Sequence, residues 1–231
     1  MDVRDISRRF GDLFALEDVT FSARSGEIVG LIGPNGAGKT TLLEILSGLL
    51  PADRGSVCWQ GTALPPARRK QVMFYVPESV TPYPDHCTGD VLQVFARVFG
   101  RNAKEVGDTV DDLSLAPVLV TRVGALSKGF RRRLLLALGL IATQPLLVMD
   151  EPFDGLDLKQ TREVMALLRR TARSGRSLLL SIHQLTDAER VCDRFVLLSG
   201  GTVRGEGGIQ DLRARAGLGE QGLEEVFLAL T

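Results

Sequence analysis

The sequence has no apolar run long enough to cross a membrane and no excess of charge of either sign. Its longest uninterrupted apolar stretch, Leu134 to Ala142, is about half of the ~20 residues that a spanning helix needs. Lysine and arginine together number 28, as do aspartate and glutamate. No overall field would therefore hold the chain on nucleic acid or on an anionic membrane, and such binding would need a local patch or a specific partner surface.

Cysteine is scarce, and a secretory signal is missing. Cys58, Cys87 and Cys192 are far apart and show no C-x-x-C spacing, which favours reduced thiols in a cytosolic protein over a disulfide framework. We expect them to pack as small buried hydrophobic residues. Residues 1–6 carry charges at strand-like spacing and lack the apolar segment of a signal peptide, so we expect the chain to stay in the cytoplasm.

The sequence does contain a phosphate-binding loop. Residues 33–40, GPNGAGKT, fit the pattern G-x-x-x-x-G-K-S/T, whose backbone N–H groups surround nucleotide phosphates. The glycines allow a sharp turn, Lys39 brings positive charge to the β- and γ-phosphates, and Thr40 offers a hydroxyl to Mg²⁺. An apolar stretch at 27–32 predicts a strand before the loop, and residues 40–46 predict a helix after it. This order favours ATP or GTP binding over a glycine-rich turn that happens to precede a lysine.

Strand and helix patterns divide the chain into three stretches. Strand signals occur at residues 2–32, 55–61 and 72–76, and from about Glu78 to Thr143 they vanish and helical patterns replace them. Strands then alternate with helices, as expected for a parallel sheet covered by helices. In the last stretch, strands are predicted at 146–149, 178–182 and 195–199 and a helix at 158–173. At 231 residues the chain is predicted to form one unit, with a core of 1–77 and 144–231 and a helical subdomain of about 78–143.

Two carboxylates, Asp150 and Glu151, follow an apolar strand. In phosphate-loop ATPases the first such acid holds Mg²⁺ and the second orients the attacking water. A buried strand with a solvated acidic end would look the same in isolation, but here a phosphate loop precedes it. We therefore predict Mg²⁺ ligands at Thr40 and Asp150, and a catalytic role for Glu151.

With these motifs the chain resembles the ATP-binding cassette (ABC) ATPases. Four further elements of that family also appear, in the family's order, across nearly all of the sequence. Phe10, just before Gly11, resembles the aromatic that stacks on adenine, although a lone phenylalanine before a turn is as often core packing. The nucleotide-binding residues that the resemblance implies are Phe10, Gly33, Pro34, Asn35, Gly36, Ala37, Gly38, Lys39, Thr40 and Thr41.

Residues 126–130, LSKGF, resemble the family's signature, usually LSGGQ, which contacts the γ-phosphate held by the opposite subunit. The resemblance assigns this contact in trans to Ser127, Lys128 and Gly129. Simple helix capping by Ser127 is the alternative. Lys128 stands where many members have glycine and Arg132 where a glutamine is common, and both departures bear on the geometry and rate of hydrolysis.

Two further positions match the family. Residues 152–157 are similar to its D-loop, in which Asp157 would reach across a dimer interface, although a helix-capping aspartate would look the same. His183 matches the switch histidine, a donor to the γ-phosphate, although a lone histidine after a strand is more often structural. The other histidine, His86, is expected on a loop surface.

Glu78 is the clearest departure, because the family usually places there a glutamine that touches Mg²⁺ and water. A carboxylate is also a hard oxygen ligand, so we predict that Glu78 still serves Mg²⁺. The three arginines 131–133 lack interleaved aromatics, so we expect a solvated helix face or a dimer rim and no nucleic acid.

The resemblance implies an α/β fold: a phosphate-loop NTPase core with a parallel sheet flanked by helices, an antiparallel β part at the N-terminus and an inserted helical subdomain. It also implies an ATPase subunit of exporter type that dimerises head to tail around two ATP and drives a separate membrane permease from the inner face of the cell membrane. We expect the permease to dock near residues 78–90, with Tyr83 as an exposed aromatic anchor.

Two other functions are compatible with a phosphate loop. A soluble ABC ATPase acting on ribosomes or DNA would need no permease, but such proteins usually have two cassettes or long coiled-coil insertions in one chain. A small-molecule kinase would leave Ser127, Asp157 and His183 unexplained. The transported substrate stays open, because its site would lie in another polypeptide.

Overall fold

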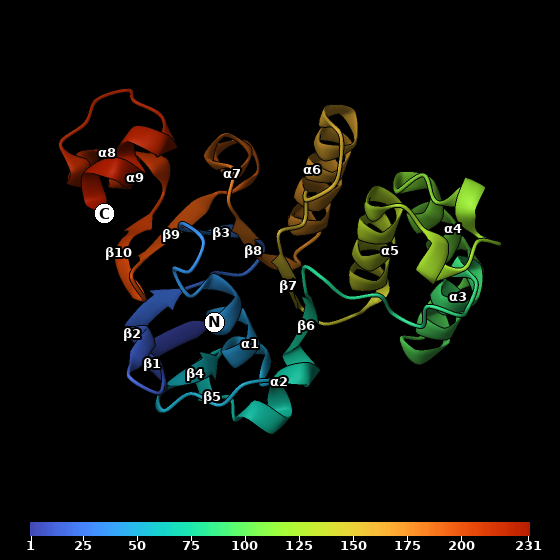
Figure 1. The fold of residues 1–231 in the computed structure, drawn as a ribbon, viewed down its shortest axis with the longest axis horizontal. Coiled ribbons are helices and arrows are strands. Elements are labelled where there is room, and N and C mark those ends of the chain that lie inside the picture. Colours follow the sequence, from blue (N-terminus) through green and yellow to red (C-terminus); the bar gives the residue numbers. More distant parts are fainter.

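A six-stranded sheet forms the middle layer of the computed structural model, which describes residues 1–231 (Figure 1). The strand order is β10-β9-β3-β8-β7-β6, and all neighbours are parallel except β10 and β9. The strands are β3 (Ile28–Ile32), β6 (Met73–Val76), β7 (Leu146–Asp150), β8 (Ser177–Ile182), β9 (Arg194–Ser199) and β10 (Thr202–Gly207). Strands β3, β7 and β8 are buried along their whole length, as their continuous apolar sequences require in a parallel sheet.

A second, antiparallel sheet is built from the N-terminal part of the chain, with the order β2-β1-β4-β5. Its strands are β1 (Asp2–Phe10), β2 (Leu13–Ser22), β4 (Arg54–Trp59) and β5 (Thr62–Ala63). Gly11 makes the turn between β1 and β2 at a φ of +58°, a conformation that glycine adopts without steric cost. The predicted α/β class, with its antiparallel N-terminal part, is confirmed.

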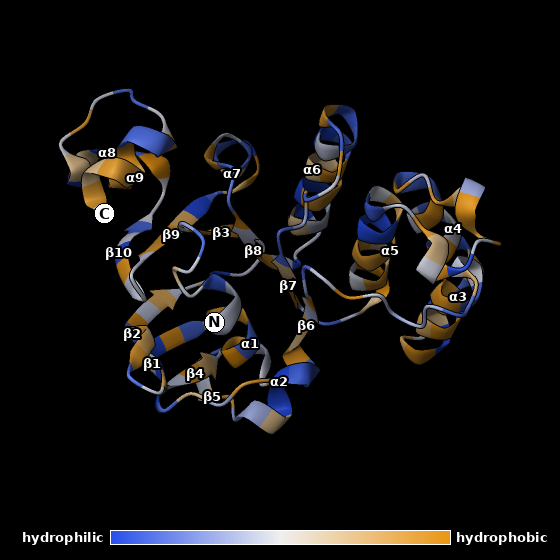
Figure 2. Ribbon diagram, in the orientation of Figure 1, coloured by the Kyte–Doolittle hydropathy of each residue, from blue (hydrophilic) through white to orange (hydrophobic).

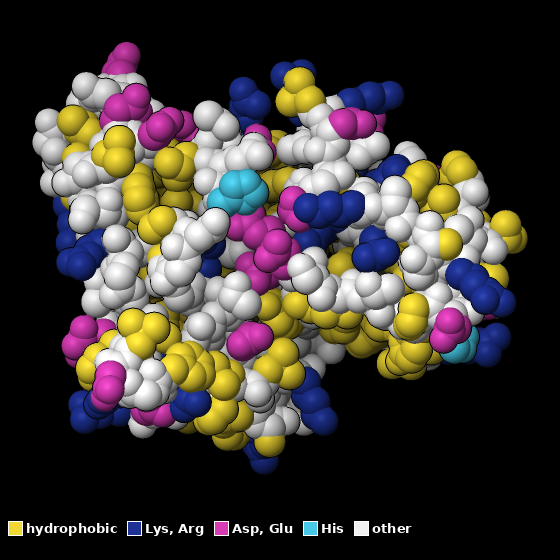
Figure 3. Space-filling view, viewed as in Figure 1, with side chains coloured by type: hydrophobic (Ala, Val, Ile, Leu, Met, Phe, Trp, Pro, Cys, Tyr) yellow, Lys and Arg dark blue, Asp and Glu magenta, His cyan; other side chains and the backbone are white.

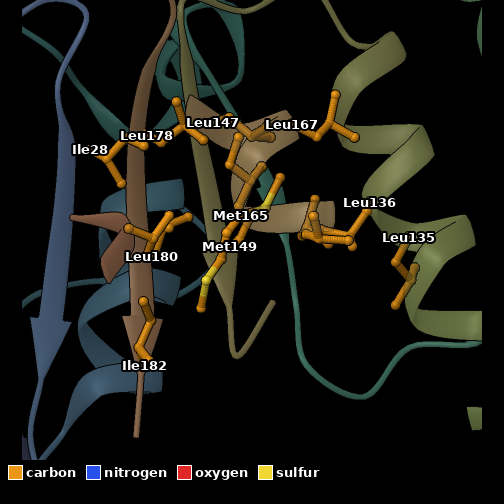
Figure 4. Packing of buried hydrophobic residues seen from close by; sticks show 14 of the residues in the cluster. Ile28, Leu135, Leu136, Leu147, Met149, Met165, Leu167, Leu178, Leu180 and Ile182 are labelled. Carbon is orange, nitrogen blue, oxygen red and sulfur yellow. The ribbon is translucent and has the colours of Figure 1, made fainter. Parts of the chain in front are cut away.

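Side chains alternate along the central strands between two hydrophobic clusters. In β3, Ile28 and Ile32 belong to the cluster beneath helices α5, α6 and α7, whereas Val29 and Leu31 face α1 and the N-terminal sheet. Figure 4 shows side chains of β7 and β8 packed with those of α6 and α5 in the first cluster. The central strands are mostly orange in Figure 2, in agreement with burial on both faces.

Helices cover the sheet and fill the interval between β6 and β7. They are α1 (Lys39–Ser47), α2 (Pro66–Val72), α3 (Thr88–Val98), α4 (Ala103–Asp112), α5 (Lys128–Ile141), α6 (Leu158–Arg173), α7 (Leu185–Val191), α8 (Ile209–Ala216) and α9 (Leu223–Leu230), with 3₁₀ turns at Ala116–Val118 and Val123–Ala125. No helix has the length and apolarity needed to span a bilayer. Residues 78–143 contain no strand, only an isolated bridge between Cys87 and Arg122. That they form a separate subdomain stays a prediction.

Side-chain caps set the start of three of these helices. Asn102 before α4 and Asp157 before α6 each accept a hydrogen bond from the backbone three residues on, and Glu105 and Gln160 complete the capping boxes. Ser127 caps α5 by accepting from the amide of Phe130 at 3.3 Å. Each cap satisfies an amide that would otherwise lack a partner, worth about 1 kcal/mol.

The prediction of a solvated helix face was wrong for two of the three arginines. Arg132 and Arg133 are only 3% and 8% exposed, and they donate to backbone carbonyls of segments distant in the sequence. Charge pattern alone suggested solvation, but a guanidinium with five N–H donors can be buried where enough carbonyls surround it. The prediction for the cysteines fits Cys58 and Cys192, which are buried, whereas Cys87 is half-buried.

Candidate nucleotide site

The phosphate loop follows β3, Asp150 is the last residue of β7, and His183 follows β8, which lies between the other two strands. Parallel strands end at one edge of a sheet, so these segments meet there. A cavity of about 680 Å³ opens at this edge. Its lining includes Phe10, Asn35, Gly36, Gly38, Lys39, Thr40, Thr41, Glu78, Asp150, Glu151 and His183 from the predicted set. Figure 3 shows acidic side chains gathered at the centre of this face, over the ends of β7 and β8, next to a histidine.

The phosphate loop has the backbone that its glycines permit. Gly38 has a φ of +101°, and a Cβ there would lie 2.5 Å from the carbonyl oxygen of Ala15, so no other residue fits. Gly36 has a φ of +81°, and nothing lies within 4 Å of where its Cβ would be. Lys39 begins α1, and its Nζ donates to the carbonyls of Gly33 at 2.7 Å and Pro34 at 3.2 Å. A lysine and a helix N-terminus thus meet at the cavity, an arrangement suited to anionic phosphates.

Asp150 is held by hydroxyls from three elements. Thr40 Oγ1 donates to its Oδ2 at 2.8 Å, Ser181 Oγ to its Oδ1, and the Tyr75 hydroxyl lies 3.5 Å from Oδ2. Burial, together with the nearby Asp150 carboxylate, raises the pKa of Tyr75, so the phenol keeps its proton. The sequence analysis missed Ser181 and Tyr75. Ser181 could be found only from the strand order, because it is the β8 residue paired with Asp150.

Glu151 contacts His183 directly, with 2.6 Å between Oε2 and Nδ1. Its backbone has a φ of +49°, an unusual value for a residue with a side chain that costs on the order of 1–3 kcal/mol. The amide of Glu151 donates to both the carbonyl and the hydroxyl of Ser181, at 3.2 Å each. Burial raises the pKa of the Glu151 carboxyl, and His183 and Lys39 partly oppose this shift. A strained carboxylate with a raised pKa is typical of a functional position.

One end of the cavity is apolar. Phe10 and Phe14 line it beside Leu13, and all three are partly exposed. The guanidinium of Arg8 lies 4.8 Å from the centre of the Phe10 ring. Flat aromatic faces of this kind can stack on a nucleobase. Phe14 was missed, although it lies just across the Gly11 turn, paired with Arg9 on β1.

Oxygen ligands line the same cavity. The Thr40 hydroxyl and the Asp150 carboxylate lie 2.8 Å apart, and Glu78 lines the same cavity. Hydroxyl and carboxylate oxygens are the ligands that Mg²⁺ prefers, and Mg²⁺ is commonly held by one or two carboxylates together with substrate phosphates and water. The residues present therefore fit this ion.

The other predicted residues do not line the cavity. Ser127, Lys128 and Gly129 begin α5, and Asp157 caps α6. Lys128 pairs instead with Asp154 at 2.7 Å. The predicted residues Gly33, Pro34 and Ala37 lie in the loop but are also absent from the lining, and Ala37 is buried. Within one chain, the segment that resembles the signature therefore stands apart from the phosphate loop.

The sequence profile of the ABC transporter family matches residues 16–154, which include the phosphate loop, the segment 126–130 and both acids. The chain belongs to this family. Like the ATP-binding parts of ABC transporters, it binds ATP and hydrolyses it, with a phosphate-loop fold and an energy-coupling role in transport.

Individual ABC proteins resemble the chain over nearly its whole length. The Nod factor export ATP-binding protein I of Burkholderia lata is 36% identical over 213 residues, which cover 90% of this chain and 70% of that protein. An uncharacterized ABC transporter ATP-binding protein of Methanocaldococcus jannaschii is 32% identical over 214 residues, 91% of this chain and 78% of that one. A solved structure of an ATP binding subunit of an ABC transporter superposes with a TM-score of 0.89 at 32% identity and covers 99% of this chain and 98% of its own.

Proposed function

We propose that two copies of this ABC protein close head to tail around two ATP molecules and drive a separate membrane permease that exports a solute. One observation supports the proposed dimer: Ser127, Lys128 and Gly129 lie outside the cavity of their own chain. They begin α5, and a helix N-terminus offers N–H groups to an anion. In this arrangement they reach the γ-phosphate held by the partner chain, and ATP joins the two copies until it is hydrolysed.

The residues of the cavity divide the work of hydrolysis. Phe10 stacks on the base, and residues 33–41 hold the phosphates. Thr40, Asp150 and Glu78 would hold Mg²⁺, which would neutralise charge on the transferring phosphoryl group.

Glu151 accepts a hydrogen bond from the attacking water, aligns it and takes its proton as general base, while His183 donates to the γ-phosphate. The 2.6 Å contact between these two side chains supports this shared role, because both also line the cavity. Most of the rate enhancement is then electrostatic.

The permease is proposed to dock on the loop that follows β6. Tyr83 in this loop is 54% exposed and has a φ of +49°, so its ring projects from a constrained backbone. His86 packs edge-on against the ring, with 5.9 Å between ring centres. An exposed aromatic is the kind of residue that anchors an interface. Docking here would place the chain on the inner face of the cell membrane. Export is inferred from relatives named for the export of Nod factors.

Capture of the partner tests this proposal. Tagged Glu151→Gln protein with ATP and Mg²⁺, extracted with detergent from the membranes of its own cells, is expected to bring down a polytopic membrane protein in stoichiometric amount. Tyr83→Ala in the same background is expected to reduce that yield at least about tenfold, the size of an anchor residue's effect on binding.

The matched control in the capture is Leu228→Ala. Leu228 is also an exposed hydrophobic residue, but it lies on α9, which packs against α7 and α8 and not against the proposed docking loop. Copurification of ribosomes or DNA, with no membrane protein, would contradict the transport role and leave the nucleotide site unaffected.

A further inference from the structure

Arg132 lies behind the nucleotide site and has no role in the functions described so far. It is in the second turn of α5, its side chain is buried, and it faces away from solvent toward the ends of β6 and β7. Burial lowers the pKa of its guanidinium, and the carboxylates of Asp154, Glu78, Asp150 and Glu151 oppose that shift. Its charge therefore lies among the acids of the site.

Its position contradicts the local rules for helices. The start of α5 carries Lys128 and three arginines and no acidic residue, although cations are unfavourable near a helix N-terminus. Where a sequence departs from a local preference without an evident gain in stability, a functional reason is expected.

The hydrogen bonds of Arg132 supply such a reason, because they join two segments of the site. Its Nη2 donates to the carbonyl of Glu78 at 2.6 Å, and its Nη1 lies 3.4 Å from the carbonyl of Pro77 and 3.3 Å from that of Asp150. The planar fork thus spans the loop after β6 and the end of β7, and a single ammonium group cannot reach both in the same way.

The carbonyl of Asp150 belongs to the peptide whose orientation sets the φ of Glu151. That peptide is bound on both sides: Arg132 donates to its oxygen, and its N–H donates to Ser181. Glu151 has a positive φ, and such a conformation persists only where the surroundings determine it. Arg132 and Ser181 together therefore hold the backbone that aims the Glu151 carboxylate.

We infer that Arg132 is a positioning residue for hydrolysis: it fixes the Asp150–Glu151 peptide and the Glu78 loop against the helix that begins with the signature residues. This inference rests on the proposed role of Glu151. Arg132 does not itself line the cavity and has no hydrogen bond to the phosphate loop, and it reaches the lining residues Glu78 and Asp150 only through their backbone carbonyls. It therefore acts on the rate of hydrolysis and not on the binding of ATP.

Arg133 provides a matched control. It follows Arg132 on the same helix and is also buried, but it donates to the carbonyls of Leu113 and Ser114 at 3.2 and 3.4 Å, away from the site. Arg133→Lys removes the same planar fork from the same helix. Any general damage to α5 should therefore appear in both variants.

The test compares steady-state ATP hydrolysis by Arg132→Lys, Arg133→Lys, Glu151→Gln and the wild-type protein, with thermal melting of each. For Arg132→Lys we expect kcat to fall about 10- to 100-fold, as for groups that orient ligands of a reactive centre, with KM for ATP within about twofold of wild type. Arg133→Lys is expected to keep kcat within about threefold.

The inference is overturned if Arg132→Lys keeps its kcat, if both arginine variants lose kcat equally, or if the loss appears in KM. If Arg132→Lys is too unstable to assay, Arg132→Gln replaces it with the same expectation. The glutamine side chain has a single NH₂ donor group, which cannot bind both the loop after β6 and the end of β7. Near-normal turnover by Glu151→Gln would instead refute the proposed function, so the two failures are distinguishable.

Discussion

The Glu151→Gln variant is expected to bind ATP normally and to hydrolyse it on the order of 10²- to 10⁴-fold more slowly than the wild-type protein, the usual contribution of a positioned general base. The amide keeps the size of the side chain, but it cannot accept a proton from water. The contact with His183 at 2.6 Å and the positive φ of Glu151 fix the position of the carboxylate that this substitution removes. Phosphate release at saturating ATP measures the rate, and calorimetry measures the affinity.

A remote glutamate controls for the loss of a carboxylate as such. Glu163 is exposed on α6, where its nearest ionic partner is Lys159 at 3.9 Å, and Glu163→Gln should hydrolyse ATP at the wild-type rate. Turnover by Glu151→Gln within about fivefold of wild type would show that another group activates the water.

Lys39→Ala is expected to weaken ATP binding by about 10- to 100-fold. Hydrogen bonds to a charged group are worth about 1.5–3 kcal/mol, and about 1.4 kcal/mol corresponds to a factor of ten in affinity. Lys39 is only 8% exposed and begins the helix whose N-terminus faces the cavity, so bulk water cannot replace its charge there. Calorimetric titration with ATP measures the effect.

Two further variants separate loss of the phosphate contact from damage to the loop. Lys39 also donates to the carbonyls of Gly33 and Pro34, so the melting temperature of Lys39→Ala without nucleotide reports whether the loop itself loosens. Lys159→Ala, a change to an exposed lysine on α6, should leave the affinity unchanged. An unchanged affinity in Lys39→Ala would mean that the phosphates bind elsewhere.

Much of the site follows from sequence where a motif carries its own local structure. The segment 33–40 needs only a strand before it and a helix after it, and β3 and α1 begin and end within about one residue of expectation. Asp150 and Glu151 can also be predicted from the sequence, because the apolar strand ahead of them is continuous. Helix α6 was predicted at 158–173 and spans those residues, since its apolar periodicity is strong.

What the sequence does not reveal depends on partners distant in the chain. Ser181 reaches Asp150 only because β8 lies beside β7, and no sequence pattern near residue 181 predicts that pairing. The charge pattern predicts a solvated face for Arg132, because it does not show which backbone carbonyls surround the side chain. Two of its acceptors, the carbonyls of Pro77 and Glu78, lie more than 50 residues before it in the sequence. Short elements without strong periodicity, such as α7, β10 and α8, were also absent from the prediction.

The closure of two copies around ATP is the claim on which the proposed mechanism depends. Sedimentation of Glu151→Gln tests it most directly, because this variant is expected to hold ATP without consuming it. With saturating ATP and Mg²⁺ we predict a dimer, and with ADP a monomer. Ser127→Arg in the same background, which places a bulky cation at the start of α5, should stay monomeric. If Glu151→Gln remains a monomer with ATP bound, the head-to-tail site is contradicted.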